Sequence, residues 1–289
     1  MSVRSVDAGA KAEGSSPRAR RAWLNTYMVV GGLMVLLLVA LTVLAPLLAP
    51  KDPNAINPIN ALKPFGFEGH VLGTDNLGRD LFSRMLYGGL ITLLSGAVAA
   101  FLSVGLGVLL GVLGAYFGGW TDLLIARLLD ILMGFPFILL AILFVAAAGP
   151  STLTALVAVA IANVPFSARL VRSEALRVRE QEYITAASAL GASHGRVMLR
   201  HLLPNVASII IPTLFMTMGW MIGQTSALSF LGLGTQPPTA DWGSMLAESQ
   251  NYMTSLPEVA MLPGLAIVFA VLGLNLFGVG LRAMLLRER

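Results

Sequence analysis

The chain has 289 residues, of which 56% are hydrophobic and only 12% charged, with a formal net charge of +4. Soluble domains are about a quarter charged, so this composition indicates an integral membrane protein. The sequence contains no cysteine, which excludes disulfides, thiolate catalysis and cysteine-based metal sites.

The N-terminal segment, residues 1–25, is rich in Ser, Ala, Gly and Arg and is expected to be a disordered cytosolic tail. The apolar run that follows has a basic flank, as a signal peptide does. It is longer than the 7–15 residues of a signal-peptide core, and no clear cleavage site follows it. We therefore expect an uncleaved anchor and a membrane domain over residues 26–289.

Apolar runs long enough to cross a bilayer recur along the rest of the chain, since a hydrocarbon core of ~30 Å takes about 20 residues of helix. The third run contains Pro136 and the fifth Pro212. Neighbouring helices can satisfy the backbone groups that a proline frees. The pattern predicts an all-α protein with six transmembrane helices, at 27–49, 90–116, 123–147, 152–171, 206–231 and 260–282.

Basic residues set the orientation of these helices. The N-terminal tail, the 172–205 loop with its flank and the C-terminal tail hold 14 of the 19 Lys and Arg residues. Cytoplasmic segments carry the excess of Lys and Arg. We therefore expect both termini and the 172–205 loop in the cytosol, and loops 50–89 and 232–259 outside.

The second run contains two pairs of small residues four apart, Gly107 with Gly111 and Gly114 with Gly118. Such pairs let helix backbones approach closely. We favour tight packing inside one bundle over a subunit interface or a moving gate.

The outer loops carry charged and aromatic residues. Thr74 or Asp75 is expected to cap a helix that continues into the second run. Trp242 suits a membrane interface, and two prolines mark a turn before it. Either loop could instead contact an external partner. The candidate contact residues are Asp75, Arg79, Asp80, Arg84, Pro237 and Trp242. Of these, Arg79, Asp80 and Arg84 are expected to face water or headgroups.

Ionisable residues are scarce in the apolar runs. Arg127 and Asp130 are three residues apart and are expected to form a structural pair on one helix face. An ion-coupled carrier normally places acidic or histidine side chains at mid-membrane, and none lies clearly there. The three histidines fall in loops without a paired catalytic set, so an intramembrane enzyme is not favoured and no metal site is expected.

The cytosolic loop at 172–205 is predicted to contain two short helices. Ile184, Ala187 and Leu190 fall on one face of a helix that begins near Glu182. Gly191 can end this helix with a positive φ. Ser193 then caps a second helix, which Pro204 stops. From the pattern alone, a docking element and a surface loop without a partner are equally good interpretations.

This loop resembles the EAA loop of ABC-importer permeases. The motif stands here as Thr185-Ala186-Ala187, then Gly191, then Leu203-Pro204, with Thr185 in place of the leading Glu. The resemblance implies that the loop couples the chain to ATPases, through Glu182, Tyr183, Thr185, Ala186, Ala187, Leu190, Gly191, Leu203 and Pro204.

Three further segments resemble the C-type subunit of the dipeptide, oligopeptide and nickel permeases. They are Gly73-Thr74-Asp75 through Arg84, Phe230 through Gly243, and Asn275-Leu276-Phe277-Gly278. In relatives the last segment usually continues with two aspartates, where this chain has Val279 and Ala283.

The resemblance implies a type I ABC importer permease fold. It further implies a second permease subunit, two cytosolic ATPases that bind ATP and Mg, and an external solute-binding protein, in a bacterial inner membrane. This chain has no phosphate-binding loop of its own, and no cofactor or nucleic acid is expected. Peptides are the expected substrate, with nickel chelates, glutathione or another small solute as alternatives. The candidate path residues are Asn163, Ser167, Met216, Gln224, Thr225 and Ser226.

Overall fold

The computed structural model describes residues 17–285, with side chains from residue 26 onward. The first helix, α1 (Pro17–Val43), begins before the expected boundary at residue 26 and is followed by the short α2 (Ala45–Leu48). Most of the expected tail, residues 1–16, lies outside the described residues.

Five described helices are long and apolar enough to cross a membrane. They correspond to five of the six predicted runs. The C-terminal end of each helix lies within a few residues of the end of its predicted run or beyond it. They are α1, α3 (Leu81–Phe117), α6 (Thr152–Arg179), α9 (Leu203–Phe230, continuous with the turns before it) and α11 (Glu258–Leu285).

The third predicted run is not one straight helix. It forms α4 (Gly119–Met133) and α5 (Phe137–Ala148), which meet at a bend of 88°. Pro136 has no N–H and its ring crowds the preceding turn, and Gly134 ends α4 just before it. The expectation that the bundle would tolerate this proline within a helix was therefore wrong, and a sixth span exists only if both arms are counted together.

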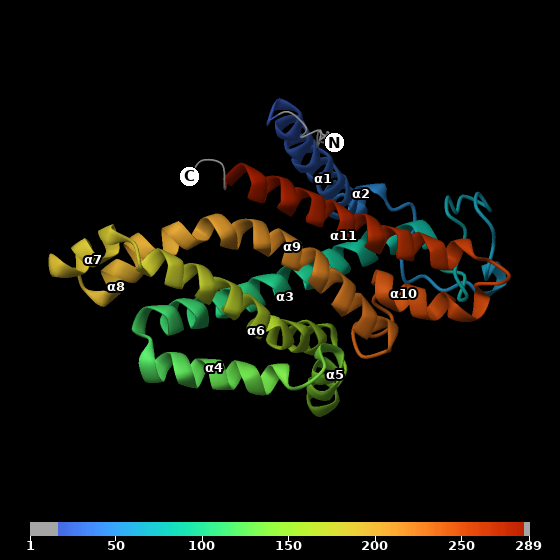
Figure 1. Cartoon of the computed structure of the whole chain (residues 1–289). Helices are drawn as coiled ribbons and strands as arrows, with labels where there is room; N and C mark the ends of the chain where they lie inside the picture. The colour runs from blue at the N-terminus through green and yellow to red at the C-terminus, as the bar shows by residue number, and fades with distance from the viewer. Residues whose placement is uncertain (1–16, 286–289) are drawn as a thin grey trace, which may run out of the picture.

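The long helices pack in one bundle. In Figure 1, α3 runs beside α6 and α9, while α11 lies between α9 and α1. A Cβ added at Gly107 would lie 2.5 Å from Cβ of Ser167, and one added at Gly111 would lie 2.7 Å from the carbonyl oxygen of Ala168. Both glycines thus hold α3 against α6, which confirms the prediction of tight packing inside the bundle.

The connecting elements gather at opposite ends of the bundle. One end carries α7 (Glu182–Ala189) and α8 (His194–Val197), and the other carries α10 (Trp242–Ser249) with the 50–80 loop (Figure 1). Short helical turns also occur at Pro58–Asn60, Met198–Leu202 and Gln250–Tyr252.

The cap of α3 differs from the prediction. Asp80, and neither Thr74 nor Asp75, is the N-cap, and its carboxylate accepts from the Ser83 amide at 2.8 Å. Asp75 instead accepts from the amides of Leu77 and Arg79. Because that turn already uses the Asp75 carboxylate, the helix begins later.

Candidate functional site

The loop at the α7 end is organised by Gly191. Its φ is +80°, its amide donates to the carbonyl of Ser188, and the next amide, of Ala192, donates to that of Ala187. This pair of bonds is the Schellman ending of a helix, which needs a left-handed residue at that position. The prediction that Gly191 ends this helix with a positive φ is confirmed.

Three large apolar side chains of this loop are exposed among polar and small residues. Leu190 is 89% exposed, and Tyr183 and Leu199 are also exposed, whereas Ile184 is buried. Leu190, which was expected on the same helix face as Ile184, is the capping residue beyond the last helical turn. We call Tyr183, Leu190 and Leu199 the inner apolar surface.

Pro204 does not stop the second helix. A π-turn over Met198–Leu202 widens the helix, with the amide of Leu203 donating to the carbonyl of Met198, and α9 continues from there. Pro204 lies in the first turn of α9, where a missing N–H costs little. Ser193 occupies the N-cap position of α8, as expected, but its side chain makes no capping hydrogen bond.

The loop is anchored to the last turn of α3 on both flanks. Before α7, the Arg179 guanidinium donates to the carbonyl of Ala115 at 2.6 Å. After α7, the Tyr116 hydroxyl lies 2.8 Å from Nδ1 of His194. Leu202 is buried against the same end of α3 and α6. Movement of α7 is therefore tied to α3.

Two carboxylates of α4 pair with α6. Asp130 accepts from Arg169 at 2.6 Å, whereas Arg127 is 4.0 Å away from it. Asp122 forms a two-pronged pair with Arg172. The predicted pair of Arg127 with Asp130 is thus present, but the shorter ion pair of Asp130 is the tertiary one with Arg169.

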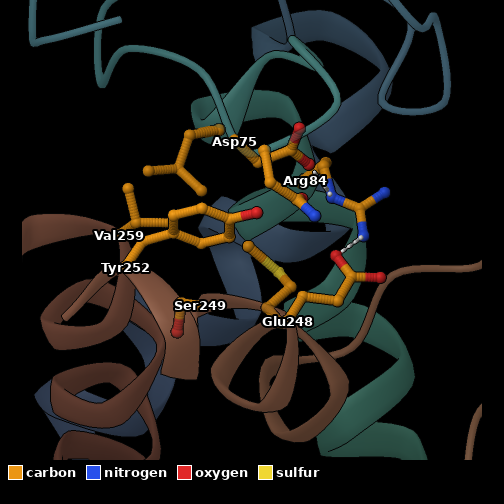
Figure 2. Close-up of a pocket in the computed structure, with 9 residues that line it drawn as sticks. Asp75, Arg84, Glu248, Ser249, Tyr252 and Val259 are labelled. Atoms are coloured by element: carbon orange, nitrogen blue, oxygen red, sulfur yellow. Dashed lines mark hydrogen bonds and ion pairs between the residues drawn. The ribbon is translucent and has the colours of Figure 1, made fainter. Parts of the chain in front are cut away.

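At the opposite end, Asp75, Arg79, Arg84 and Glu248 form a network that we call the outer ion-pair network. Figure 2 shows Arg84 between Asp75 and Glu248. Arg79 donates to Asp75 at 2.6 Å and to Glu248 at 2.5 Å. Two cations face two anions, so the network is neutral, and it joins the 50–80 loop and α3 to α10.

A second group extends this network. Asp80 accepts from Nδ1 of His70 at 2.8 Å, and Nε2 of His70 lies 2.8 Å from the ammonium of Lys51. Since the ammonium can only donate, His70 accepts at Nε2 and carries its proton on Nδ1.

The expectation that the charged residues of this loop face water was wrong. Asp80 and Arg84 are each 1% exposed and Arg79 is 3% exposed, because their opposite charges lie within the loop and on α10. Trp242 is also no interface anchor: it is 2% exposed and its indole N–H donates to the carbonyl of Met85 at 2.9 Å. Among the six candidate contact residues, Pro237 is exposed.

A cavity of about 630 Å³ opens between the α4–α5 bend and helices α6, α9 and α11. Its wall is mostly apolar and aromatic, and Phe137 and Trp220 meet there edge to face. The lining residues are Leu132, Met133, Phe135, Phe137, Ala162, Asn163, Pro165, Phe166, Leu170, Thr213, Met216, Thr217, Trp220, Asn275 and Arg282. A cavity of this size suits a small solute.

The candidate path residues separate into groups. Asn163 and Met216 line the cavity. Ser167 lies between α3 and α6, next to Ser103. Thr225 and Ser226 line a small void nearer to α10, and Gln224 is half-buried. A role in transport stays a prediction for all six.

Sequence reasoning missed Tyr116, Trp220, Glu248, Asn275 and Arg282 as site residues. Tyr116 contacts His194, which is 78 residues away in the sequence, and Glu248 contacts Arg84, which is 164 residues away. No local spacing signals such contacts.

Residues 103–288 match the family described as "Binding-protein-dependent transport system inner membrane component". Residues 19–64 match the "N-terminal TM domain of oligopeptide transport permease C".

Individual relatives span most of the chain. It is 42% identical to the dipeptide transport system permease protein DppC of Alkalihalophilus pseudofirmus, over 89% of this chain and 84% of that protein. It is also 42% identical to the glutathione transport system permease protein GsiD of Pectobacterium atrosepticum, over 91% and 87%. A chain of the MetNI methionine ABC transporter in an inward-facing conformation superposes with a TM-score of 0.58, covering 70% of this chain and 95% of that one at 18% identity. The last comparison shows a shared fold.

Proposed function

The chain belongs to the family of binding-protein-dependent transport system inner membrane components, permease subunits of ABC importers, and from this premise we propose that it forms half of a peptide path driven by partner ATPases. Substrates named for its relatives, dipeptides and glutathione, support a short peptide. Glutathione itself is the second candidate, since one 42%-identical relative is named for it.

The inner apolar surface supports docking of cytosolic ATPases. Tyr183 and Leu190 are exposed on α7 and its C-cap, and Leu199 is exposed in the turn that leads into α9. Large apolar side chains exposed together on a surface mark interaction sites. This observation carries the proposal. Two ATPases would bind ATP and Mg, and closure of the pair would move α7 and, through Arg179 and His194, the end of α3.

Membership in the family supports the remaining partners. A second permease subunit would complete the cavity wall, and a solute-binding protein would dock on the opposite end, at α10 and the 50–80 loop. In that arrangement the protein lies in a bacterial cytoplasmic membrane with both termini inside. An ion-coupled carrier or channel is the competing class of function.

Purification from the native membrane in mild detergent, followed by mass spectrometry, tests this proposal. We expect a second permease and P-loop ATPases to co-purify with this chain, and ATP hydrolysis by the complex to rise with substrate-loaded binding protein. Recovery of the chain alone or as a homo-oligomer, with uptake driven by an ion gradient, would instead establish the carrier.

A further inference from the structure

The cavity wall carries a single sign of charge. Of its fifteen lining residues, Arg282 is the one ionised side chain, and Asn163, Thr213, Thr217 and Asn275 are neutral and polar. No carboxylate lines it, so the field inside the cavity favours an anionic group over a cationic one.

Arg282 has no intramolecular counter-charge within the described side chains. None of the ion pairs between them includes Arg282. The residues one turn earlier on α11 are Gly278 and Val279, which supply no carboxylate at i−4 or i−3. The Arg282 side chain is also exposed, so its guanidinium is accessible to a ligand, and its fork geometry matches a carboxylate.

The two asparagines of the cavity leave acceptor oxygens for a ligand. The Asn163 amide donates to the hydroxyls of Ser103 and Ser167 at 2.9 and 3.3 Å. The Asn275 amide donates to the carbonyl of Val271 at 2.8 Å. Since each amide already donates to a partner within the bundle, its oxygen remains to accept from N–H groups of a solute.

Asn275 and Arg282 are seven residues apart on one helix, which is about 10 Å along its axis. An extended peptide of three residues has about the same length. A short peptide could therefore place its terminal carboxylate on Arg282 while its amides face Asn275.

We propose that Arg282 binds the carboxylate of the transported solute, so that the cavity selects short amide-containing acids. This inference deepens the proposed function and rests on the cavity being its path. Arg282 acts here as a substrate-binding residue at the end of the cavity nearest the C-terminus of α11.

Cysteine protection tests this directly. Because the chain has no cysteine, Thr213→Cys places a single thiol of this chain on the cavity wall. Inside-out vesicles that contain the whole assembly are treated with N-ethylmaleimide, with or without trialanine or trialanine amide, and labelling of this chain is followed over time. The assay needs no ATP hydrolysis, so its result does not depend on whether the ATPases couple.

We expect trialanine to slow labelling. In Arg282→Gln, the trialanine concentration that gives half protection should rise about tenfold, which is the factor for the loss of one charge-assisted pair. Arg282→Lys should retain part of the protection. Arg196→Gln, an equivalent change on exposed α8 outside the cavity, should retain all of it. Equal protection by the amide, equal protection in Arg282→Gln, or no protection by either peptide would overturn the proposal. The proposed function would still be decided separately by co-purification.

Discussion

At the scale of single residues, the inner loop depends on the left-handed backbone of Gly191. No atom lies within 4 Å of a Cβ added there, so a substitution acts through φ alone. We expect Gly191→Val to cost about 1–2 kcal/mol locally, to displace α7, and to lower transport per ATP hydrolysed while the protein still inserts. The measurement is peptide uptake and ATP hydrolysis by the same proteoliposomes.

Gly195 provides the matched control for Gly191. It lies four residues further on in α8, also has open space around its Cβ position, and has no positive φ. Gly195→Val should leave the transport-to-hydrolysis ratio unchanged. A normal ratio in Gly191→Val, or an equal fall in both variants, would contradict the coupling role of this turn.

The sequence was informative about this turn because its bonds are local. Gly191 was recognisable as a helix-ending residue from the five residues around it. Sequence alone could not predict the Tyr116–His194 contact or the burial of Arg79 and Arg84, because the partners of these side chains come from distant segments. A charge in an outer loop looks solvent-exposed until its counter-charge, here Glu248, is placed beside it.

At the scale of helices, the contact of α3 with α6 depends on glycine. Gly107→Leu would force a side chain into Ser167 and the backbone of Ala168, and overpacking of this kind costs about 1–3 kcal/mol or more. Gly105→Leu, two residues earlier, points into open space. We expect heating to aggregate Gly107→Leu at a lower temperature than the parent, and Gly105→Leu to match it, as read by size-exclusion chromatography. Equal heat stability of the two variants would show that the close approach is dispensable.

Helix positions followed from hydropathy, whereas the bend did not. Five predicted runs became long helices since apolar length alone decides them. The run at 123–147 has the same composition, yet α4 and α5 diverge by 88°. In that segment the geometry at Gly134 and Pro136 outweighs apolar length. The bend is also what opens the cavity, because Leu132, Met133, Phe135 and Phe137 flank it.

At the scale of the whole molecule, α3 connects the two ends. Its 37 residues span about 55 Å. Arg84 in its first turn pairs with Glu248, and Ala115 and Tyr116 in its last turn hold the inner loop. If binding protein and ATPases act at these two ends, α3 is the continuous element through which either could influence the other.

Glu248→Gln tests this connection at its outer end. The change removes the carboxylate that Arg79 and Arg84 share, and leaving such cations short of a partner costs about 1–3 kcal/mol. The cost lies at the lower end because the Glu248 side chain is 26% exposed. We expect α10 to loosen from α3, so that binding protein stimulates ATP hydrolysis less. Glu68→Gln changes an exposed side chain of the 50–80 loop and should keep full stimulation. The ratio of stimulated to basal hydrolysis in proteoliposomes measures this. An unchanged ratio in Glu248→Gln would mean that the outer network holds the loop in place without carrying the signal to α3.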